Sequence, residues 1–317
     1  DFYHRIPEFV GDLDLQIAVD AVGSTGDASN DDGESFGIDL QARGQVWRAQ
    51  AGTRWVSDDF SPELGFVSRS GIRQSELEVG FRPRAEEGSV IRRYVLEVKG
   101  RRAEEWEGAP QSVSLQIDQL GLEFQSGDEI ALFFSRRFER VATQFELFDR
   151  NGTRTPTPVF AGDYWATRSG LRFEASQGRP VSGNASVFHG DFFDGTSTSI
   201  RGNVDWRASR LLQVGADYSS TIADLGPGRE FTTQIGSGTL DLFFSPELSL
   251  RNLLQYDNDS NAIGWQSRLR WIYSPGCDFF LVLGSTWQRS RDALTQEESI
   301  VPTEQALNFK VAHTVRF

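Results

Sequence analysis

Apolar and polar residues alternate one by one through most of this chain. In residues 13–21, Leu, Ile, Val and Ala fill every second position and Asp or Gln most of the others. A period of two predicts a β-strand with one apolar and one polar face, whereas a helix repeats at about 3.6 residues. The pattern returns in residues 36–42, 47–55, 77–81, 94–99, 113–124, 130–140, 171–175, 181–189, 200–206, 212–218, 231–244, 248–256, 263–273, 279–287 and 304–317.

Short and long connections separate these segments in turn. The short ones lie at residues 44–45, 86–89, 126–128, 177–180, 208–210, 245–247 and 274–277, and the long ones at residues 24–34, 58–74, 101–111, 149–163, 191–198, 223–229, 257–262 and 289–303. Outer-membrane barrels have short periplasmic turns, long outer loops and, with an even strand number, two periplasmic termini. A slip in the alternation near Asp118 or Gln119 predicts a β-bulge, and a second slip is expected among Gly236 and Gly238.

The last segment alternates up to its final residue, Phe317. An uncovered strand edge invites pairing with other chains, and closing the sheet removes that edge. The predicted fold class is therefore all-β, a closed antiparallel transmembrane β-barrel of about sixteen strands over residues 13–317. Residues 1–12 show no clear alternation and are expected to be a periplasmic lead-in or the remnant of a linker. The predicted location is the bacterial outer membrane, with both termini periplasmic.

Composition narrows the classes of protein. The mean hydropathy is −0.40 and no run of about 18 apolar residues occurs, which excludes a helical membrane protein. A barrel strand needs only about 9–11 residues, every second one apolar, so low hydropathy agrees with a barrel. The single cysteine, Cys277, excludes an internal disulfide. A net charge of −13 argues against a nucleic-acid partner, which binds basic faces.

The polar side of the predicted strands carries many charges. Isolated charges are costly in a dry interior and tolerable in water, and a barrel of about sixteen strands leaves room for an aqueous channel unless loops plug it. Two interpretations stay open: a selective pore with a mixed-charge constriction, or a solvated wall whose charges only pair across strands. The predicted lumen lining is Arg43, Arg48, Arg54, Glu76, Glu78, Arg82, Arg172, Glu174, Arg201, Asp205, Arg207, Arg268, Arg270 and Lys310.

The connection at residues 58–74 is a candidate constriction loop. Its key residues are Asp58, Asp59, Phe60, Pro62 and Phe66. The aromatic side chains need cover, and a proline restricts the backbone, as suits a loop folded into the lumen. The alternative is that both aromatic residues pack on a neighbouring outer loop.

No arrangement of residues indicates catalysis, a metal site or a cofactor. A lipase-like site would need a serine and a histidine on neighbouring strands, and the only such pairing is Ser186 or Ser199 with His189, which chance also produces. Acidic groups in the outer loops lack the spacing of a calcium loop. We therefore predict that the chain is not an enzyme and has no cofactor.

Two motifs and the last strand carry a family resemblance. Residues 58–66, followed by an arginine-containing stretch, and residues 270–282 resemble an uncharacterised family of bacterial outer-membrane proteins, in which such a barrel follows an N-terminal β-sandwich of the carbohydrate-binding-module type. The last strand resembles the assembly signal of such barrels, with Lys310, Ala312, Val315 and Phe317 in its places and Ala312 where glycine is usual. The resemblance implies the fold and the outer-membrane location, adds a hint of glycan handling, and carries over no catalytic residue.

The sequence leaves two functions open. The first is a pore or transporter for small polar solutes, with glycan-derived solutes among them. The alternative is a non-conducting membrane anchor or scaffold for an upstream periplasmic or surface domain, or for a partner complex. Expected partners are outer-membrane lipid and lipopolysaccharide, the barrel-assembly machinery, and other outer-membrane or periplasmic proteins.

Overall fold

The chain folds into β-strands and connections in a computed structural model that describes residues 1–25, 32–61, 69–147, 157–291 and 298–314. Seventeen strands belong to one antiparallel sheet, and β9 and β10 form a separate two-stranded sheet. The predicted all-β, antiparallel class is confirmed, while closure into a barrel stays a prediction. None of the described residues forms a helix able to span a membrane.

The strands match the predicted segments closely. Each of the sixteen alternating segments lies within or overlaps one strand of the large sheet. The strands are β1 (Phe2–Val10), β2 (Leu13–Ser24), β3 (Gly33–Arg43), β4 (Trp47–Val56), β5 (Ile72–Phe81), β6 (Ile91–Glu105), β7 (Pro110–Phe124), β8 (Glu129–Val141), β9 (Phe145–Leu147), β10 (Thr157–Val159), β11 (Gly162–Ala175), β12 (Val181–Phe192), β13 (Gly195–Arg207), β14 (Leu212–Asp224), β15 (Glu230–Ser245), β16 (Leu248–Asp257), β17 (Ala262–Ser274), β18 (Cys277–Arg291) and β19 (Glu298–His313).

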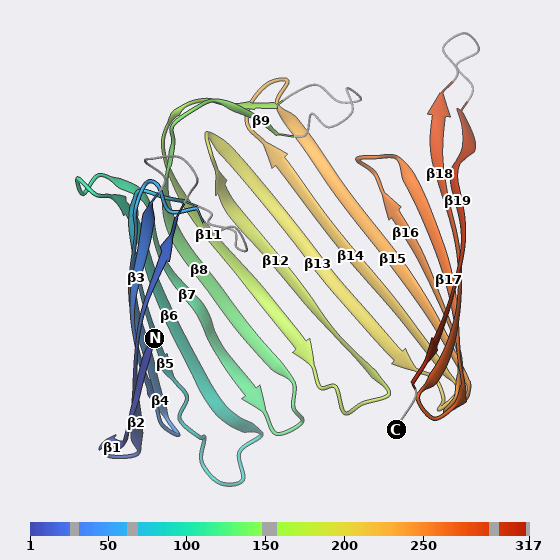
Figure 1. The fold of residues 1–317 in the computed structure, drawn as a ribbon, viewed down its shortest axis with the longest axis horizontal. Helices are drawn as coiled ribbons and strands as arrows, with labels where there is room; N and C mark the ends of the chain where they lie inside the picture. Colours follow the sequence, from blue (N-terminus) through green and yellow to red (C-terminus); the bar gives the residue numbers. More distant parts are fainter. Residues whose placement is uncertain (26–31, 62–68, 148–156, 292–297, 315–317) are drawn as a thin grey trace. The chain divides into compact units, whose positions relative to one another are not determined.

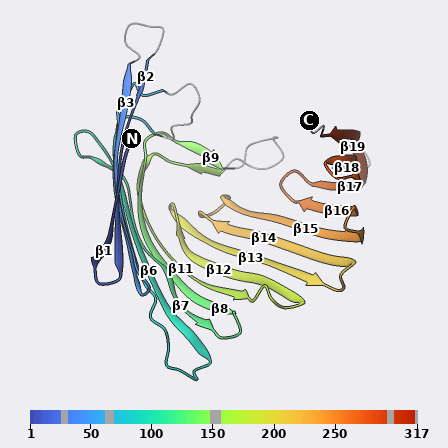
Figure 2. The ribbon, with the colours of Figure 1, turned by 60° about the horizontal axis from the view of Figure 1, so that its bottom comes forward.

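The chain divides into two compact units. Unit 1 comprises Asp1–Asp149, Pro156–Arg172 and His189–Thr196, and unit 2 comprises Arg150–Thr155, Phe173–Phe188 and Ser197–Phe317. In unit 1, β1 to β8 lie in chain order, each antiparallel to the next (Figure 1). In unit 2, β14 to β19 follow the same rule (Figure 2).

Residues of like polarity lie opposite one another across all eight strands of the unit 1 series. Neighbouring side chains in a strand point to opposite faces. Unit 1 therefore has an apolar face and a charged face. One row of opposed residues is apolar throughout: Ile6, Leu15, Ala42, Ala49, Val79, Val98, Ile117 and Phe134. The next row is polar throughout: Arg5, Gln16, Gln41, Gln50, Glu78, Lys99, Gln116 and Ser135.

The same division holds in unit 2. The row next to its apolar row carries Gln213, Asp241, Arg251 and Arg268 across β14 to β17. Alternation thus fixes which side chains share a face in each unit. The apolar row consists of Leu212, Leu242, Leu250, Leu269, Leu281 and Phe309.

The bulge predicted near Asp118 or Gln119 is confirmed. In the β7–β8 pair the register shifts between Ile117 and Leu120, and in the β6–β7 pair Gln119 lies opposite Glu97. An extra residue in one strand lets two successive side chains serve the same face. Asp118 and Gln119 therefore both belong to the charged face, and alternation resumes with Leu120.

The segment expected to be a lead-in forms strand β1. Phe2 and Ile6 lie opposite Val19 and Leu15, but His4 stands between them on the same face, and a register shift follows Ile6. These interruptions conceal the alternation in the sequence. The domain division at residue 13 stays a prediction. Because β1 makes the strand number odd, the even-number argument for periplasmic termini no longer applies, and their location also stays a prediction.

Three of the connections predicted to be long, residues 101–111, 191–198 and 289–303, are mostly strand. Only residues 106–109 separate β6 from β7, and only residues 193–194 separate β12 from β13. The charges at residues 101–105 resemble a loop, but Arg73 and Arg102 both form ion pairs with Glu104, so charged strands continue. The slip expected among Gly236 and Gly238 is also wrong, since β14 and β15 pair without a shift.

Candidate functional site

Unit 1 exposes large apolar side chains on one face and buries a carboxylate on the other, which is the opposite of a soluble domain. On the apolar face, Leu77, Leu115 and Leu132 are 54%, 61% and 55% exposed, whereas Glu97 on the charged face is only 4% exposed. Unit 2 repeats this contrast, with Asp241 at 5% and Leu254 at 52%. A protein in water buries leucine and exposes carboxylates. The apolar face therefore requires an apolar surrounding, and the charged face is the candidate site.

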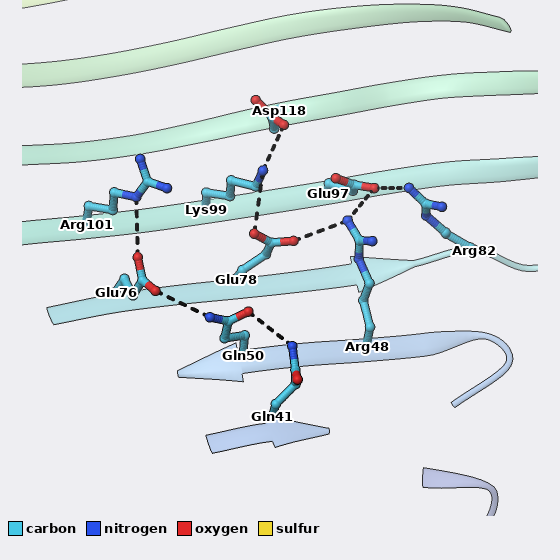
Figure 3. A network of polar contacts seen from close by, with 10 residues as sticks. All are labelled: Gln41, Arg48, Gln50, Glu76, Glu78, Arg82, Glu97, Lys99, Arg101 and Asp118. Atoms are coloured by element: carbon cyan, nitrogen blue, oxygen red, sulfur yellow. Dashed lines mark hydrogen bonds and ion pairs between the residues drawn. The ribbon is translucent and has the colours of Figure 1, made fainter. Parts of the chain in front are cut away.

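A network of ion pairs and hydrogen bonds crosses the charged face of unit 1 (Figure 3). Lys99 Nζ lies 3.0 Å from Asp118 Oδ2 and 3.5 Å from Glu78 Oε2. Glu78 in turn accepts a hydrogen bond of 3.1 Å from Arg48. The bulge in β7 places Asp118 beside Lys99, so it completes this series.

A second series runs parallel to the first. Gln41 donates to Gln50 at 3.3 Å, Gln50 donates to Glu76 at 3.4 Å, and Arg101 lies 3.6 Å from Glu76 (Figure 3). Each contact joins neighbouring strands from β3 to β6. The charged face is thus held by side chains as well as by the backbone ladder.

Two ion pairs connect strands that are not neighbours. Arg48 on β4 reaches Glu97 on β6 at 2.7 Å, and Glu97 also pairs with Arg82. Arg54 on β4 binds both carboxylate oxygens of Asp20 on β2, at 2.8 and 2.7 Å.

A glycine lies beneath each of these crossings. A Cβ atom on Gly80 would come within 2.6 Å of Arg48 Nε, and one on Gly37 within 2.6 Å of both Arg54 and Asp20. A side chain at either position would force the arginine to shift from its observed path.

Charged residues of unit 2 also pair across neighbouring strands. Arg251 pairs with the buried Asp241 at 2.7 Å, and Arg270 pairs with Asp278 at 2.9 Å. The guanidinium groups of Arg268 and Arg270 lie over the ring of Phe280, at 4.8 and 5.7 Å from its centre. These arginines are therefore anchored on their own unit.

The remaining predicted lining residues have differing surroundings. Arg207 donates to the carbonyl oxygens of Gln177 and Arg179, so it holds a short turn. Arg201 and Lys310 are exposed on β13 and β19, and Asp205 is half-buried on β13. Arg172 and Glu174 are exposed on β11. That all of these line a lumen stays a prediction.

The start of the candidate constriction loop packs against the adjoining ends of β2 and β3. The backbone N–H of Ser61 donates to Ser24 Oγ at 3.1 Å, and Ser57 N–H donates to the carbonyl oxygen of Glu34 at 2.9 Å. A Cβ on Gly33 would lie 2.3 Å from the Phe60 backbone, so this close approach requires glycine.

The structure describes some residues of the predicted constriction loop and assembly signal and not others. Asp58 and Asp59 belong to the packed segment, whereas Pro62 and Phe66 lie outside the described residues. A constriction therefore stays a prediction. In the assembly signal, Lys310 and Ala312 lie on β19 opposite Phe280 and Asp278, and Val315 and Phe317 lie outside the described residues.

The described residues contain no group of three or more His, Cys, Asp or Glu side chains able to hold a metal ion. Their closest thiol contact is Cys277 Sγ to His313 Nδ1, at 2.8 Å, next to the short turn between β17 and β18. The thiol is buried, which keeps it from solvent and favours a structural role.

Several residues of the network were absent from the predicted lining. Glu97 and Lys99 alternate with Tyr94, Leu96 and Val98, so parity alone could have identified them. Asp118 could be identified only through the bulge. Arg251 and Asp241 lie in segments that the sequence did assign to strands, but their contact depends on the register between β15 and β16.

Comparisons with known proteins add a likeness to an outer-membrane protein. No family model and no curated protein matches the chain. Among solved structures, the chain is similar to OmpT (in-vitro folded), an outer membrane protein of Vibrio cholerae, with 9% identity over 95% of this chain and 96% of that one and a TM-score of 0.34. So distant a likeness decides no function, and the family resemblance of the two motifs stays a prediction.

Proposed function

We propose that the chain is an outer-membrane β-barrel whose charged face lines a water-filled lumen that conducts small polar solutes. The observation that carries this proposal is the reversed exposure of the two faces. Leucines that are more than half exposed need lipid, and a paired carboxylate such as Glu97 suits a wall facing a polar interior.

Aromatic residues at both ends of a strand support a membrane position. Trp47 packs on Phe81 with ring centres 4.4 Å apart, and Trp55 packs on Phe36 at 5.5 Å. Trp47 and Trp55 begin and nearly end β4 on the same face. This spacing matches the roughly 9–11 residues of a membrane-spanning strand, and aromatic residues gather at both membrane interfaces of barrels.

A second candidate is a barrel that anchors or scaffolds another domain without conducting. The observation in its favour is that Arg48 and Lys99 are paired with Glu78 and Asp118, two cations with two carboxylates, which leaves fewer free charges to attract a solute. In either case the partners we propose are outer-membrane lipid with lipopolysaccharide, and the barrel-assembly machinery. Contacts with other outer-membrane or periplasmic proteins belong to the scaffold.

Planar-bilayer recording distinguishes the two candidates. Stable open steps from the purified, folded protein support the pore. A protein that is silent when intact and conducts after deletion of residues 58–74 or 149–163 supports the scaffold. Silence in both forms, despite correct folding, overturns the pore.

A further inference from the structure

One end of the charged face of unit 1 contains a hollow lined by arginines. It has a volume of about 460 Å³ and lies beside the turn between β3 and β4, with Arg43, Arg48, Arg82 and Arg93 in its wall. Ligand pockets begin at about 300 Å³. The hollow can therefore hold a small organic molecule.

Like charges face each other directly around this hollow. Arg43 on β3 lies opposite Arg48 on β4, and an isolated bridge places Arg84 opposite Arg93. Like charges directly opposite across two strands destabilise a sheet. Both arginines of the first pair and Arg93 of the second line the hollow, and a negative group there would relieve the repulsion between Arg43 and Arg48.

The carboxylates near the hollow are engaged with groups other than Arg43. Glu97 is shared by Arg48 and Arg82, Glu78 also contacts Arg48, and Glu123 lies 3.0 Å from Arg93. Asp12 accepts a hydrogen bond from the backbone N–H of Gln45, and Asp14, opposite Arg43 in the β2–β3 pair, forms its ion pair with Arg5.

Two buried donor atoms at the hollow lack an acceptor. The Nε atoms of Arg48 and Arg82 are buried without a hydrogen-bond partner. Arg43 is exposed, and no described carboxylate lies within ion-pair distance of it. An exposed, unpaired guanidinium at the rim can bind an incoming oxyanion with two parallel hydrogen bonds.

We propose that this hollow binds the carboxylate or phosphate groups of a small soluble organic acid, with Arg43 as the first contact. The inference rests on the proposed pore and assigns its solute class as anionic. The hollow lies on the charged face, whereas the exposed leucines lie on the other. A free solute therefore fits it better than a lipid headgroup.

Citrate is the probe for a calorimetric titration of the folded, full-length protein in detergent. Wild type should bind citrate saturably, and Arg43→Gln should weaken binding about tenfold, because charge-assisted hydrogen bonds are lost. Arg137→Gln is the matched control, since Arg137 is also exposed on the charged face but lies opposite Ser114. It should change binding less than about twofold. Equal losses in both variants would overturn the site.

Thermal unfolding gives a second readout. Without citrate, Arg43→Gln should raise the unfolding midpoint, because it removes repulsion from Arg48, and citrate should then raise the midpoint of wild type more than that of the variant. Citrate that raises both midpoints equally argues against the site. Binding of short-chain phosphatidic acid but not citrate overturns the assignment to a soluble acid.

Neither measurement depends on conductance. A barrel that is electrically silent but binds citrate through Arg43 overturns the pore and keeps the site. A conducting barrel that does not bind citrate overturns the site and keeps the pore.

Discussion

Gly37 and Gly80 matter for the room that they leave above the sheet. Glycine weakens a strand because it has no side chain to pack and loses more conformational freedom than other residues. Here that cost is offset by the ion pairs that pass over each glycine, Arg54 to Asp20 and Arg48 to Glu97. Each pair holds a strand on either side of the glycine.

We expect Gly80→Val to destabilise the folded protein by about 1–2 kcal/mol. The new side chain displaces Arg48 and leaves buried Glu97 with Arg82 alone, and the figure is modest because Arg48 is partly exposed. Urea unfolding in lipid vesicles measures the change. The control is Gly264→Val, because a Cβ there meets nothing within 4 Å. Equal effects of the two substitutions would show that the crossing is unimportant.

At the scale of the element, the bulge in β7 allows one strand to meet two structural requirements. The strand must keep apolar residues toward one side at both of its ends, and it must supply Asp118 to Lys99 midway. One additional residue between Ile117 and Leu120 satisfies both demands without reversing either half of the strand.

Deleting Gln119 should therefore be tolerated, since Ile117, Asp118 and Leu120 then alternate without a break. Deleting Gln116 instead joins Leu115 to Ile117 and turns one half of β7 inside out, because a shift of one residue exchanges the two faces. Heat-modifiable migration on a detergent gel should persist in the first variant and disappear in the second. The reverse order would contradict the assigned register.

At the scale of the whole molecule, the reversed exposure of the two faces makes a prediction that does not depend on conduction. Ala51 lies midway between Trp47 and Trp55 on the apolar face. Ala51→Arg should cost about 2–4 kcal/mol, the value for arginine at the bilayer midplane on the lipid side of a barrel. Gln50→Arg, one residue away on the charged face, should cost at most about 1 kcal/mol, because the hydrogen bond from Gln41 is lost while the guanidinium can still bind Glu76. Unfolding from lipid vesicles compares the two, and similar costs would exclude a lipid-facing Ala51.

The limits of sequence reasoning follow from the same features. The alternation of apolar and polar residues was enough to locate the sixteen predicted strands, because one face of each strand is nearly uniform in polarity. It missed β1, where His4 interrupts the apolar side, and it took the charged end of β6 for a loop although Glu104 pairs there with Arg73. The pairing of Arg48 with Glu97 could not be predicted either. This ion pair depends on how β4, β5 and β6 are aligned with one another, and the sequence of any one strand does not determine that alignment.

The glycine crossings also bear on how the strands find their partners during assembly. Alternation rejects a slip of one residue, which would turn a strand inside out, but it tolerates a slip of two. A slip of two between β4 and β5 would place Glu78 or Arg82 opposite Arg48 in place of Gly80, and either side chain would need the space that Arg48 occupies over Gly80. Glycine at position 80 thus favours the native register of β4 and β5 over a register shifted by two residues, because only the native register leaves this space to Arg48.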